Sequence, residues 1–259
     1  MVYPTLNTFL PAIQSLPNSR SLTKQDLVTE QFLMKKSENL ELYYAPHNEY
    51  MNKQAKVVII GITPGWKQMK TAYEQFIKSM ASGHNLETCL KETKKAAGFA
   101  GSMRTNLSRM LDQCNLPQIL GISHSEDLFG KNRDLLHTTS VIKYPVFLKG
   151  KNYTGHQPTI NRSSLLQEYA YQVFPKELEQ MASPALVIPL GKAVEQVVLH
   201  LAEKQKLSSH TYLIGFPHPS GANGHRIKQF QQQKSQLCTK VAAWGKKIEK
   251  WSNMSSFSL

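Results

Sequence analysis

A histidine lies between two prolines in the segment FPHPSGANGHR, residues 216–226. Each proline ring fixes a backbone torsion, so the chain around His218 is stiff and its imidazole is aimed in one direction. An imidazole held in this way is a candidate catalytic group, although a packed core histidine is the alternative interpretation. The small residues that follow allow a close approach to another surface, and Asn223, His225 and Arg226 carry groups that contact phosphates.

A second loop that could carry chemistry is GITPGWKQ, residues 61–68. Its two glycines and its proline predict a rigid turn that presents backbone N–H groups and one hydroxyl, that of Thr63. The spacing of a phosphate-binding P-loop is absent. A purely structural turn is the alternative interpretation for this loop taken alone.

Short apolar runs precede both loops and predict the elements that hold them. Four runs that end near glycine or proline indicate buried strands: residues 56–60, 139–142, 185–190 and 211–216. A helical segment is expected at 106–112, and helical spacing follows the third run at Val194, Val197, Val198 and Leu201. After the last run, similar spacing predicts one long packed helix through Ile227, Phe230, Leu237, Val241, Trp244, Ile248 and Trp251.

Strands that alternate with helices predict an α/β fold, namely a three-layer α/β/α sandwich with a central, mostly parallel, four-stranded sheet. We expect a single domain over residues 1–259, with a helical N-terminal extension over 1–50 and a frayed tail over 252–259. In such sheets ligands bind beyond the carboxyl ends of the strands. The segments expected at that edge are 61–68, 144–155 and 216–226.

The charge balance predicts a polyanionic partner. The chain carries 31 Lys and Arg against 18 Asp and Glu, a formal net charge of +13, which exceeds what solubility requires. A merely basic surface is the alternative, and charge alone does not separate DNA from RNA or lipid.

No stretch approaches the length of a membrane span, and the N-terminus lacks the basic start and long apolar core of a signal peptide. We therefore expect a cytoplasmic protein. Cys89, Cys114 and Cys238 are odd in number and far apart in the sequence, which disfavours a disulfide framework and a closed zinc or iron–sulfur site. We expect buried thiols and no metal.

The order of the two loops resembles the uracil-DNA glycosylase superfamily. The GITPG motif at 61–65 is similar to the first active-site motif of the mismatch-specific and single-strand-selective branches. The HPSGANGHR motif at 218–226 resembles the second motif of the classical branch in its length and in its closing His-Arg. These loops are the specific part of a resemblance that spans about residues 55–250.

Three segments between the loops agree with this resemblance. Residues 98–112 are similar to the helix whose leading phenylalanine, here Phe99, stacks on the base. Residues 138–145 are similar to the strand with the base-reading asparagine, a position that Ser140 occupies in this chain. Residues 186–193 are similar to the penultimate strand and its turn.

The resemblance implies a monofunctional DNA glycosylase that rotates one nucleotide out of the stack and hydrolyses its base–sugar bond, without a metal or other cofactor. His218 and backbone N–H groups near Ile62 would stabilise the departing anionic base, and Thr63 would hold the attacking water. Phe99 and Ser140 would bind the base. Phosphate contacts would fall to Ser220, Asn223, His225, Arg226 and Lys67.

Three residues depart from the family's pattern. Thr63 replaces the Asp or Asn that positions water in many members, and a hydroxyl is no general base near neutral pH. Ser140 replaces the base-reading Asn, and its single hydroxyl cannot imitate the donor–acceptor pair that an amide presents to the edge of uracil. Ala222 replaces the leucine that fills the gap in the classical branch, which leaves His225, Arg226 or no residue for that role. A single-stranded or distorted substrate fits this last change.

The small side chain of Ser140 also leaves room for a modified base. Removal of hypermodified cytosines from phage DNA, as bacterial antiviral defence, is one role in this superfamily, and we expect such a base in preference to plain uracil. General uracil repair and a catalytically silent nucleic-acid binder are the alternatives. A small-molecule enzyme would leave the charge of +13 unexplained. The expected partner is DNA, bound by a monomer with no obligate protein partner.

Overall fold

The computed structural model describes the backbone of residues 3–207 and 209–255, and side chains up to residue 250. Contacts between Cα atoms divide the chain into two compact units. The first unit consists of Met1–Asn52, Gly61–Ala100 and Thr138–Glu179, and the second of Lys53–Ile60, Gly101–His137 and Gln180–Leu259. The single domain expected over the whole chain stays a prediction.

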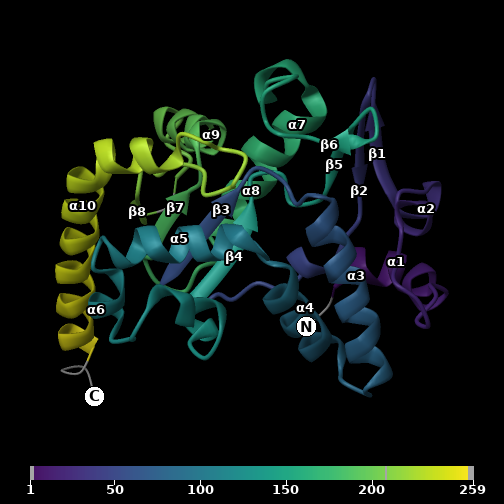
Figure 1. The fold of residues 1–259 in the computed structure, drawn as a ribbon, viewed down its shortest axis with the longest axis horizontal. Helices are drawn as coiled ribbons and strands as arrows, with labels where there is room; N and C mark the ends of the chain where they lie inside the picture. Colours follow the sequence, from purple (N-terminus) through teal and green to yellow (C-terminus); the bar gives the residue numbers. More distant parts are fainter. Residues whose placement is uncertain (1–2, 208, 256–259) are drawn as a thin grey trace. The chain divides into compact units, whose positions relative to one another are not determined.

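The helices of the first unit are α1 (Pro4–Gln14), α2 (Lys24–Leu27), α3 (Trp66–Ala81), α4 (Leu86–Ala97), α7 (Ser164–Glu168) and α8 (Phe174–Leu178) (Figure 1). The helices α3 and α4 pack against each other. The apolar residues of α3 recur on one face at helical spacing, and this face is buried: Met69, Ala72, Tyr73 and Phe76. A short 3-10 helix, Pro46–Asn48, contacts both α3 and α4.

An antiparallel sheet with the strand order β1-β2-β5-β6 completes the first unit. Its strands are β1 (Leu33–Ser37), β2 (Leu40–Tyr43), β5 (Val146–Leu148) and β6 (Lys151–Asn152). The pairs Leu40–Leu148 and Phe147–Asn152 set its register.

This sheet corrects one expectation, because residues 1–50 are not a purely helical extension: β1 and β2 form a hairpin there. Much of the segment 144–155 is a second hairpin, β5–β6, for which no strands were predicted. Sequence reasoning missed these strands because each is only a few residues long and shows little alternation. The two hairpins are joined into one sheet by the pair β2–β5, which is distant in sequence.

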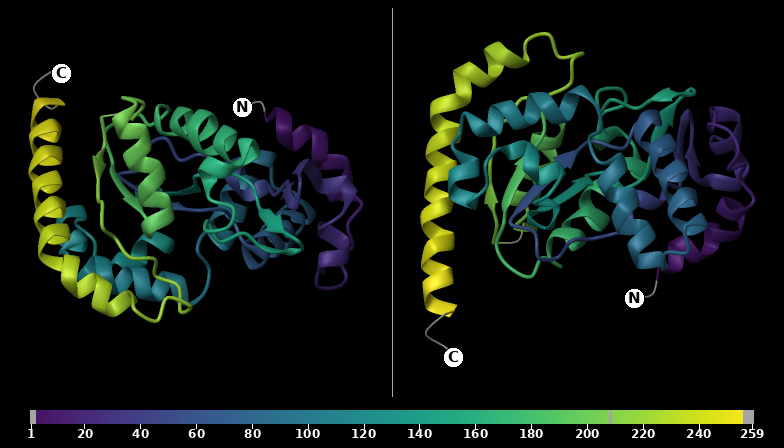
Figure 2. Two further views of the ribbon diagram at one scale, coloured as in Figure 1. Left: turned by 90° about the horizontal axis from the view of Figure 1, so that it is seen from above. Right: turned by 60° about the horizontal axis from the view of Figure 1, so that its bottom comes forward.

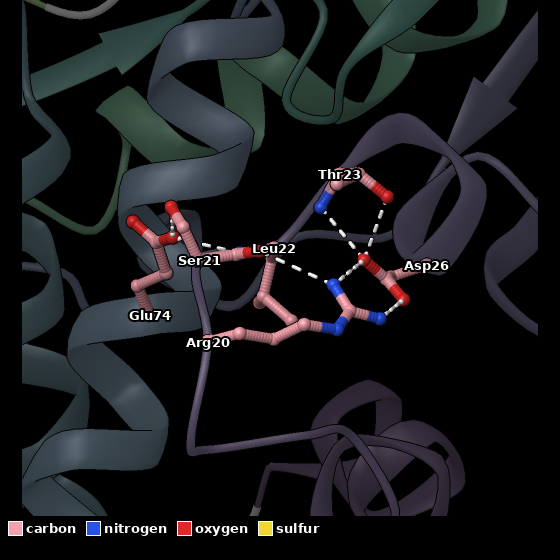
Figure 3. Close-up of polar contacts among 6 residues, drawn as sticks. All are labelled: Arg20, Ser21, Leu22, Thr23, Asp26 and Glu74. Carbon is pink, nitrogen blue, oxygen red and sulfur yellow. Dashed lines mark hydrogen bonds and ion pairs between the residues drawn. The ribbon is translucent and has the colours of Figure 1, made fainter.

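Polar contacts attach the segment before α2 to α3 (Figure 3). The Glu74 carboxylate on α3 accepts hydrogen bonds from the Ser21 hydroxyl at 2.8 Å and from the Leu22 amide at 3.0 Å. Arg20 forms a two-pronged ion pair with Asp26, with nitrogen–oxygen distances of 2.9 and 2.6 Å. These contacts fix the position of Leu22, whose side chain is buried.

The second sheet has the strand order β4-β3-β7-β8. Its strands are β3 (Val57–Gly61), β4 (Leu136–Ser140), β7 (Leu186–Pro189) and β8 (Thr211–Tyr212). Val57 pairs with Leu186 and Leu186 with Thr211, both in parallel. Every residue of β3, β4 and β7 is buried, as expected for parallel strands that are covered on both faces.

The expected α/β fold with a parallel four-stranded sheet is therefore confirmed. The strand bounds differ from the apolar runs: β8 ends at Tyr212, four residues before the end of the run 211–216, and β4 starts at Leu136, three residues before the run 139–142.

Helices flank this sheet, and those of the second unit are α5 (Ser102–Asp112), α6 (Leu116–Leu120), α9 (Lys192–Glu203) and α10 (Arg226–Ser255) (Figure 1). The helix predicted at 106–112 lies inside α5. The helix α9 contacts β7, and the four apolar residues predicted on its inner face are all buried: Val194, Val197, Val198 and Leu201.

The long helix α10 contacts α6 and changes direction along its length (Figure 2). Four residues of its predicted apolar face are buried as expected: Phe230, Leu237, Val241 and Trp244. Ile248 is half-buried, and Trp251 lies outside the described side chains. Ile227 was expected on this face as well, and that expectation is wrong, because 64% of the residue is exposed.

The frayed tail predicted over residues 252–259 is wrong for residues 252–255, because α10 continues to Ser255. Residues 256–259 lie outside the described part of the chain. Within the described residues, no helix combines the length and the apolar character needed to cross a membrane.

Two of the three cysteines are buried thiols, as expected: Cys89 and Cys114. Cys238 is only half-buried, so the expectation is wrong for this residue. Although they are far apart in sequence, the thiols of Cys114 and Cys238 interact: burial, followed by the hydrogen bond to Cys238, raises the pKa of Cys114 to about 12. The Cys238 thiol also donates to the Gln113 carbonyl at 3.3 Å.

We predict that Leu237→Ala lowers the free energy of unfolding by roughly 2–5 kcal/mol, because this fully buried side chain of α10 would leave a cavity. Denaturation in urea measures the change. Leu199→Ala on α9 is the matched control, because Leu199 is 44% exposed and its loss should change stability by no more than about 0.5 kcal/mol. Equal effects of the two substitutions would contradict the placement of the apolar face of α10.

Candidate active site

The GITPG loop leaves β3 and is held by backbone groups of the first unit. The Thr63 hydroxyl donates to the Tyr144 carbonyl at 2.8 Å and accepts from the Val146 amide at 3.2 Å. A hydroxyl has one proton and two acceptor sites, so Thr63 retains one acceptor site for a water molecule. Thr63 is therefore a clamp between the loop and β5, and its predicted role at an attacking water is limited to accepting one hydrogen bond.

The end of the same loop is held by Asn152 of β6, which sequence reasoning missed. Asn152 Oδ1 accepts from the amide of Trp66, the first residue of α3, at 2.9 Å. A Cβ atom on Gly65 would lie 3.4 Å from Asn152 Nδ2, so the two residues are in close contact. No local signal marks Asn152, because it acts across 86 positions of sequence. Lys67, expected to contact phosphate, lies exposed in the first turn of α3.

The residues expected to bind a base meet at Gly61. A Cβ atom on Gly61 would lie 3.2 Å from Phe99 Cε1 and 3.6 Å from Ser140 Oγ, so the Phe99 ring edge rests on the glycine, close to the Ser140 hydroxyl. Phe99 is 6% exposed and Ser140 is 7% exposed. Ile62 follows directly, and its carbonyl accepts from the Ile142 amide at 3.0 Å. The first unit thus brings together the predicted base-binding residues.

Phe99 has an unusual backbone conformation. Its φ angle is 52°, in the left-handed region that bulky side chains avoid, and such strain costs roughly 1–3 kcal/mol. The residue lies between the end of α4 at Ala97 and the start of α5 at Ser102. Strain of this kind is found preferentially at functional sites, so the conformation supports a functional role for the Phe99 ring.

A buried polar cluster supports the segment that binds Thr63. The Lys94 ammonium on α4 donates to Asn48 Oδ1, and Asn48 Nδ2 donates to the Lys143 carbonyl, both at 2.5 Å. Lys94 is 2% exposed. Burial, and then the charges of Lys94 and Lys143, hold the pKa of His47 well below its usual value, so His47 is neutral. In the sequence Lys94 resembles a solvent-exposed lysine of a charged helix, and nothing local indicates its burial.

His218 lies in the second unit, in the loop that follows β8. The Ser220 amide donates to His218 Nδ1 at 3.3 Å. A ring nitrogen that accepts a hydrogen bond carries no proton, so the neutral ring is protonated on Nε2. Burial lowers the pKa of His218 below its usual value, which favours the neutral form at neutral pH. The geometry therefore provides a neutral imidazole with an Nε2–H donor.

Two residues that sequence reasoning missed set the position of His218. Gly191, which follows β7, has a φ of 81°, and a Cβ atom there would lie 2.8 Å from the His218 Cβ atom, so only glycine fits. The Gly191 amide donates to the Phe216 carbonyl at 2.9 Å. On α5, Asn106 Nδ2 donates to the Pro219 carbonyl at 2.9 Å. A glycine after a strand was visible in the sequence, but its contact with His218 was not.

The remainder of the HPSGANGHR loop is stabilised by its own side chains. Asn223 Nδ2 donates to the His218 carbonyl at 3.1 Å and to Gln229 Oε1 at 2.9 Å. Both amide protons of Asn223 are thus used, one within the loop and one at the first turn of α10, which favours a loop-forming role over the predicted phosphate contact. Ser220 Oγ accepts from the Ala222 amide at 3.2 Å.

The two basic residues at the end of this loop, His225 and Arg226, are less committed to internal hydrogen bonds than Asn223. His225 is exposed and Arg226 is half-buried. The Arg226 guanidinium donates to the Asn223 carbonyl at 3.2 Å, which uses only one of its five N–H groups. The phosphate contacts predicted for both residues stay a prediction. Among the described residues, no group of three or more His, Cys, Asp or Glu side chains could hold a metal ion.

Comparisons with known proteins bear on both loops. The sequence profile described as "Uracil DNA glycosylase superfamily" matches residues 48–242, which include the GITPG and HPSGANGHR motifs. The chain is 50% identical over 244 residues to a protein of Bacillus subtilis (strain 168) named "Uncharacterized protein YoxB", and the match covers 94% of each chain. No solved structure matches the chain.

We predict that Gly61→Ala destabilises the protein by roughly 1–3 kcal/mol, because the added methyl group would press on the Phe99 ring at 3.2 Å. Urea denaturation measures the change. Gly224→Ala is the matched control, since a Cβ atom there meets nothing within 4 Å. If Gly61→Ala were as harmless as the control, Phe99 would not rest on Gly61.

Proposed function

The chain belongs to the uracil DNA glycosylase superfamily, and on this premise we propose that it hydrolyses the bond between a base and its deoxyribose and leaves an abasic site. Family membership supports a hydrolase of N-glycosyl bonds with DNA as its partner. The observation that carries the proposal for this chain is the hydrogen bond from the Ser220 amide to His218 Nδ1, because it leaves Nε2–H as a donor.

His218 acts on the leaving group. When the base–sugar bond breaks, its electron pair goes to the base, which becomes anionic, while the sugar develops positive charge. A neutral Nε2–H donor aimed at the base stabilises this anion without transferring a proton. A preorganised donor of this kind typically contributes roughly 10²- to 10³-fold in rate. Backbone N–H groups near Ile62 are proposed as further donors to the same anion.

Phe99 and Ser140 are proposed to select the base. The extruded base stacks on the Phe99 ring, an interaction worth roughly 1–3 kcal/mol. The Ser140 hydroxyl is a single atom and, unlike an amide, cannot present a donor atom and an acceptor atom side by side to the edge of a base. The small Ser140 side chain therefore favours a bulkier, modified base over plain uracil. The substrate class that we propose is a hypermodified cytosine, such as those in phage DNA.

The proposed site activates the attacking water only weakly. Thr63 has already committed its proton to Tyr144, so it accepts one hydrogen bond from water and cannot remove the proton. We therefore propose slow turnover that depends on stabilisation of the leaving base. The same observation favours a second candidate function, a catalytically silent member of the family that binds DNA without cleaving it.

DNA binding is proposed to rest on phosphate contacts. The net charge of +13 supplies affinity that does not depend on sequence and falls steeply with salt. Ser220, His225, Arg226 and Lys67 are the proposed phosphate contacts.

The test is release of a base from a panel of single-stranded and duplex DNAs that carry uracil or modified cytosines, detected as alkali-labile sites. We predict that His218→Ala slows single-turnover release by roughly 10²- to 10³-fold with little change in DNA affinity. His218→Gln should retain part of the rate, because the glutamine amide also offers an N–H donor.

The pH dependence distinguishes donation by His218 from a structural role. The neutral imidazole is the active form and its pKa lies below the ordinary value of about 6.5. The wild-type rate should therefore be constant above this pH and fall in more acidic solution, as the ring becomes protonated. His218→Gln should lack this acid-side fall. DNA binding without alkali-labile sites on any substrate would establish the silent binder instead.

A further inference from the structure

Two of the three cysteines meet in the second unit. Cys114 lies just after α5, and Cys238 lies on α10. The Cys238 thiol donates to the carbonyl of Gln113, the residue directly before Cys114, at 3.3 Å and across 125 positions of sequence. The thiols of Cys114 and Cys238 are also hydrogen-bonded to each other. From such a contact the two sulfur atoms need only a short approach to reach the disulfide length of about 2 Å.

Contacts on both sides hold this pair in place. Gln113 Nε2 donates to the Arg109 carbonyl on α5 at 3.2 Å, and Gln113 Oε1 accepts from the Lys234 ammonium on α10 at 3.1 Å. Further along α10, a Cβ atom on Gly245 would lie 3.0 Å from Ile119 Cγ2 on α6, so these two helices are in close contact. Because α10 is attached to the end of α5 and to α6, the two thiols remain neighbours.

The two thiols differ in their access to solvent. Cys238 is half-buried, whereas Cys114 is 2% exposed. Burial, followed by the hydrogen bond to Cys238, raises the pKa of Cys114 to about 12, although the charge of Lys234 acts in the opposite direction. Cys114 is therefore a protected thiol, and a small oxidant dissolved in water reaches Cys238 first.

We propose that Cys114 and Cys238 are a site of reversible oxidation, which hydrogen peroxide converts into an intramolecular disulfide. The Cys238 sulfur attacks one peroxide oxygen, the O–O bond breaks, and a sulfenic acid and water are formed. The Cys114 sulfur then attacks the Cys238 sulfur, the S–O bond breaks, and the hydroxyl group leaves with the Cys114 proton as a second water. One peroxide molecule gains the two electrons that the two thiols lose.

The second step needs no access from solvent. Cys114 already contacts the sulfur atom that it attacks, and the Lys234 ammonium favours the thiolate, which is the attacking form. The remaining thiol, Cys89, belongs to the first unit, where it is buried and donates to the His84 carbonyl at 3.5 Å. We therefore expect Cys89 to stay reduced.

The disulfide joins α10 to the end of α5. A covalent link between positions so far apart in sequence restricts the unfolded chain. The oxidised protein should therefore unfold at a temperature roughly 5–10 °C above that of the reduced protein. The inference does not depend on the proposed function, because it requires neither DNA nor release of a base.

The experiment treats the full chain, reduced at the start, with a small excess of hydrogen peroxide at neutral pH. The remaining thiols are blocked with iodoacetamide, and the protein is digested without reductant and analysed by mass spectrometry. We expect one linked pair of peptides, which contains Cys114 and Cys238, and a blocked Cys89. The number of titratable thiols in the denatured protein should fall from three to one, and dithiothreitol should restore all three.

Three serine variants assign the steps. Cys89→Ser should form the bridge as the wild type does. Cys114→Ser lacks the second thiol, so sulfenic acid at Cys238 should accumulate and react with dimedone. Cys238→Ser should leave Cys114 reduced at the same dose of peroxide, because burial protects this thiol. The rise in unfolding temperature on oxidation should occur in the wild type and in Cys89→Ser, and should be absent from the other two variants.

Several outcomes would overturn this assignment. Three free thiols after peroxide treatment would show that the pair does not react. A sulfinic acid at Cys238 beside a free Cys114 would show that the second thiol does not reach the first. A disulfide that links two chains through Cys238, or one that includes Cys89, would place the reactive pair elsewhere. Base release by the untreated wild type is measured separately, and its absence would contradict only the glycosylase proposal.

Discussion

The hydrogen bond from the Ser220 amide to His218 Nδ1 is the interaction on which the proposed chemistry depends. Because it occupies Nδ1, the neutral ring carries its proton on Nε2 and can donate to an anionic base. Burial adds to this by lowering the pKa of His218. Two contacts within the second unit hold His218 in place. Gly191, after β7, has no side chain and so leaves room for the His218 Cβ atom, and Asn106 on α5 donates a hydrogen bond to the Pro219 carbonyl. The loop at this end of the parallel sheet thus holds a histidine whose donor nitrogen is defined.

In the first unit the constraint is the close contact at Gly61, where there is no room for a side chain. The Phe99 ring edge rests on this glycine, beside the Ser140 hydroxyl, and the strained backbone of Phe99 shows that the surrounding structure enforces this position. Thr63, through the Val146 amide, and Asn152, through the Trp66 amide, attach the GITPG loop and the start of α3 to the hairpin β5–β6. These contacts make the loop rigid, but they occupy the Thr63 hydroxyl, which would have to be free in a site that activates water. This exchange agrees with chemistry that depends on leaving-group stabilisation more than on water activation.

Much of the fold was predictable from sequence, because parallel strands are continuous apolar runs and the inner face of α9 repeats at helical spacing. The motifs also indicated Thr63 and His218 as site residues. The antiparallel sheet was not predictable, since its strands are short and the pair β2–β5, which joins its two hairpins, is distant in sequence. Nor were the supporting contacts: Asn152, Asn106 and Lys94 act through partners far away in sequence, and no local pattern encodes such contacts.

The protonation state of His218 can be observed by nitrogen–proton correlation NMR of the histidine rings, with His218→Gln used to assign the signal. At neutral pH we expect a neutral ring with the proton on Nε2 and a bare Nδ1, titrating below the ordinary value of about 6.5. An imidazolium at neutral pH, or a neutral ring protonated on Nδ1, would show that His218 is not the proposed Nε2–H donor.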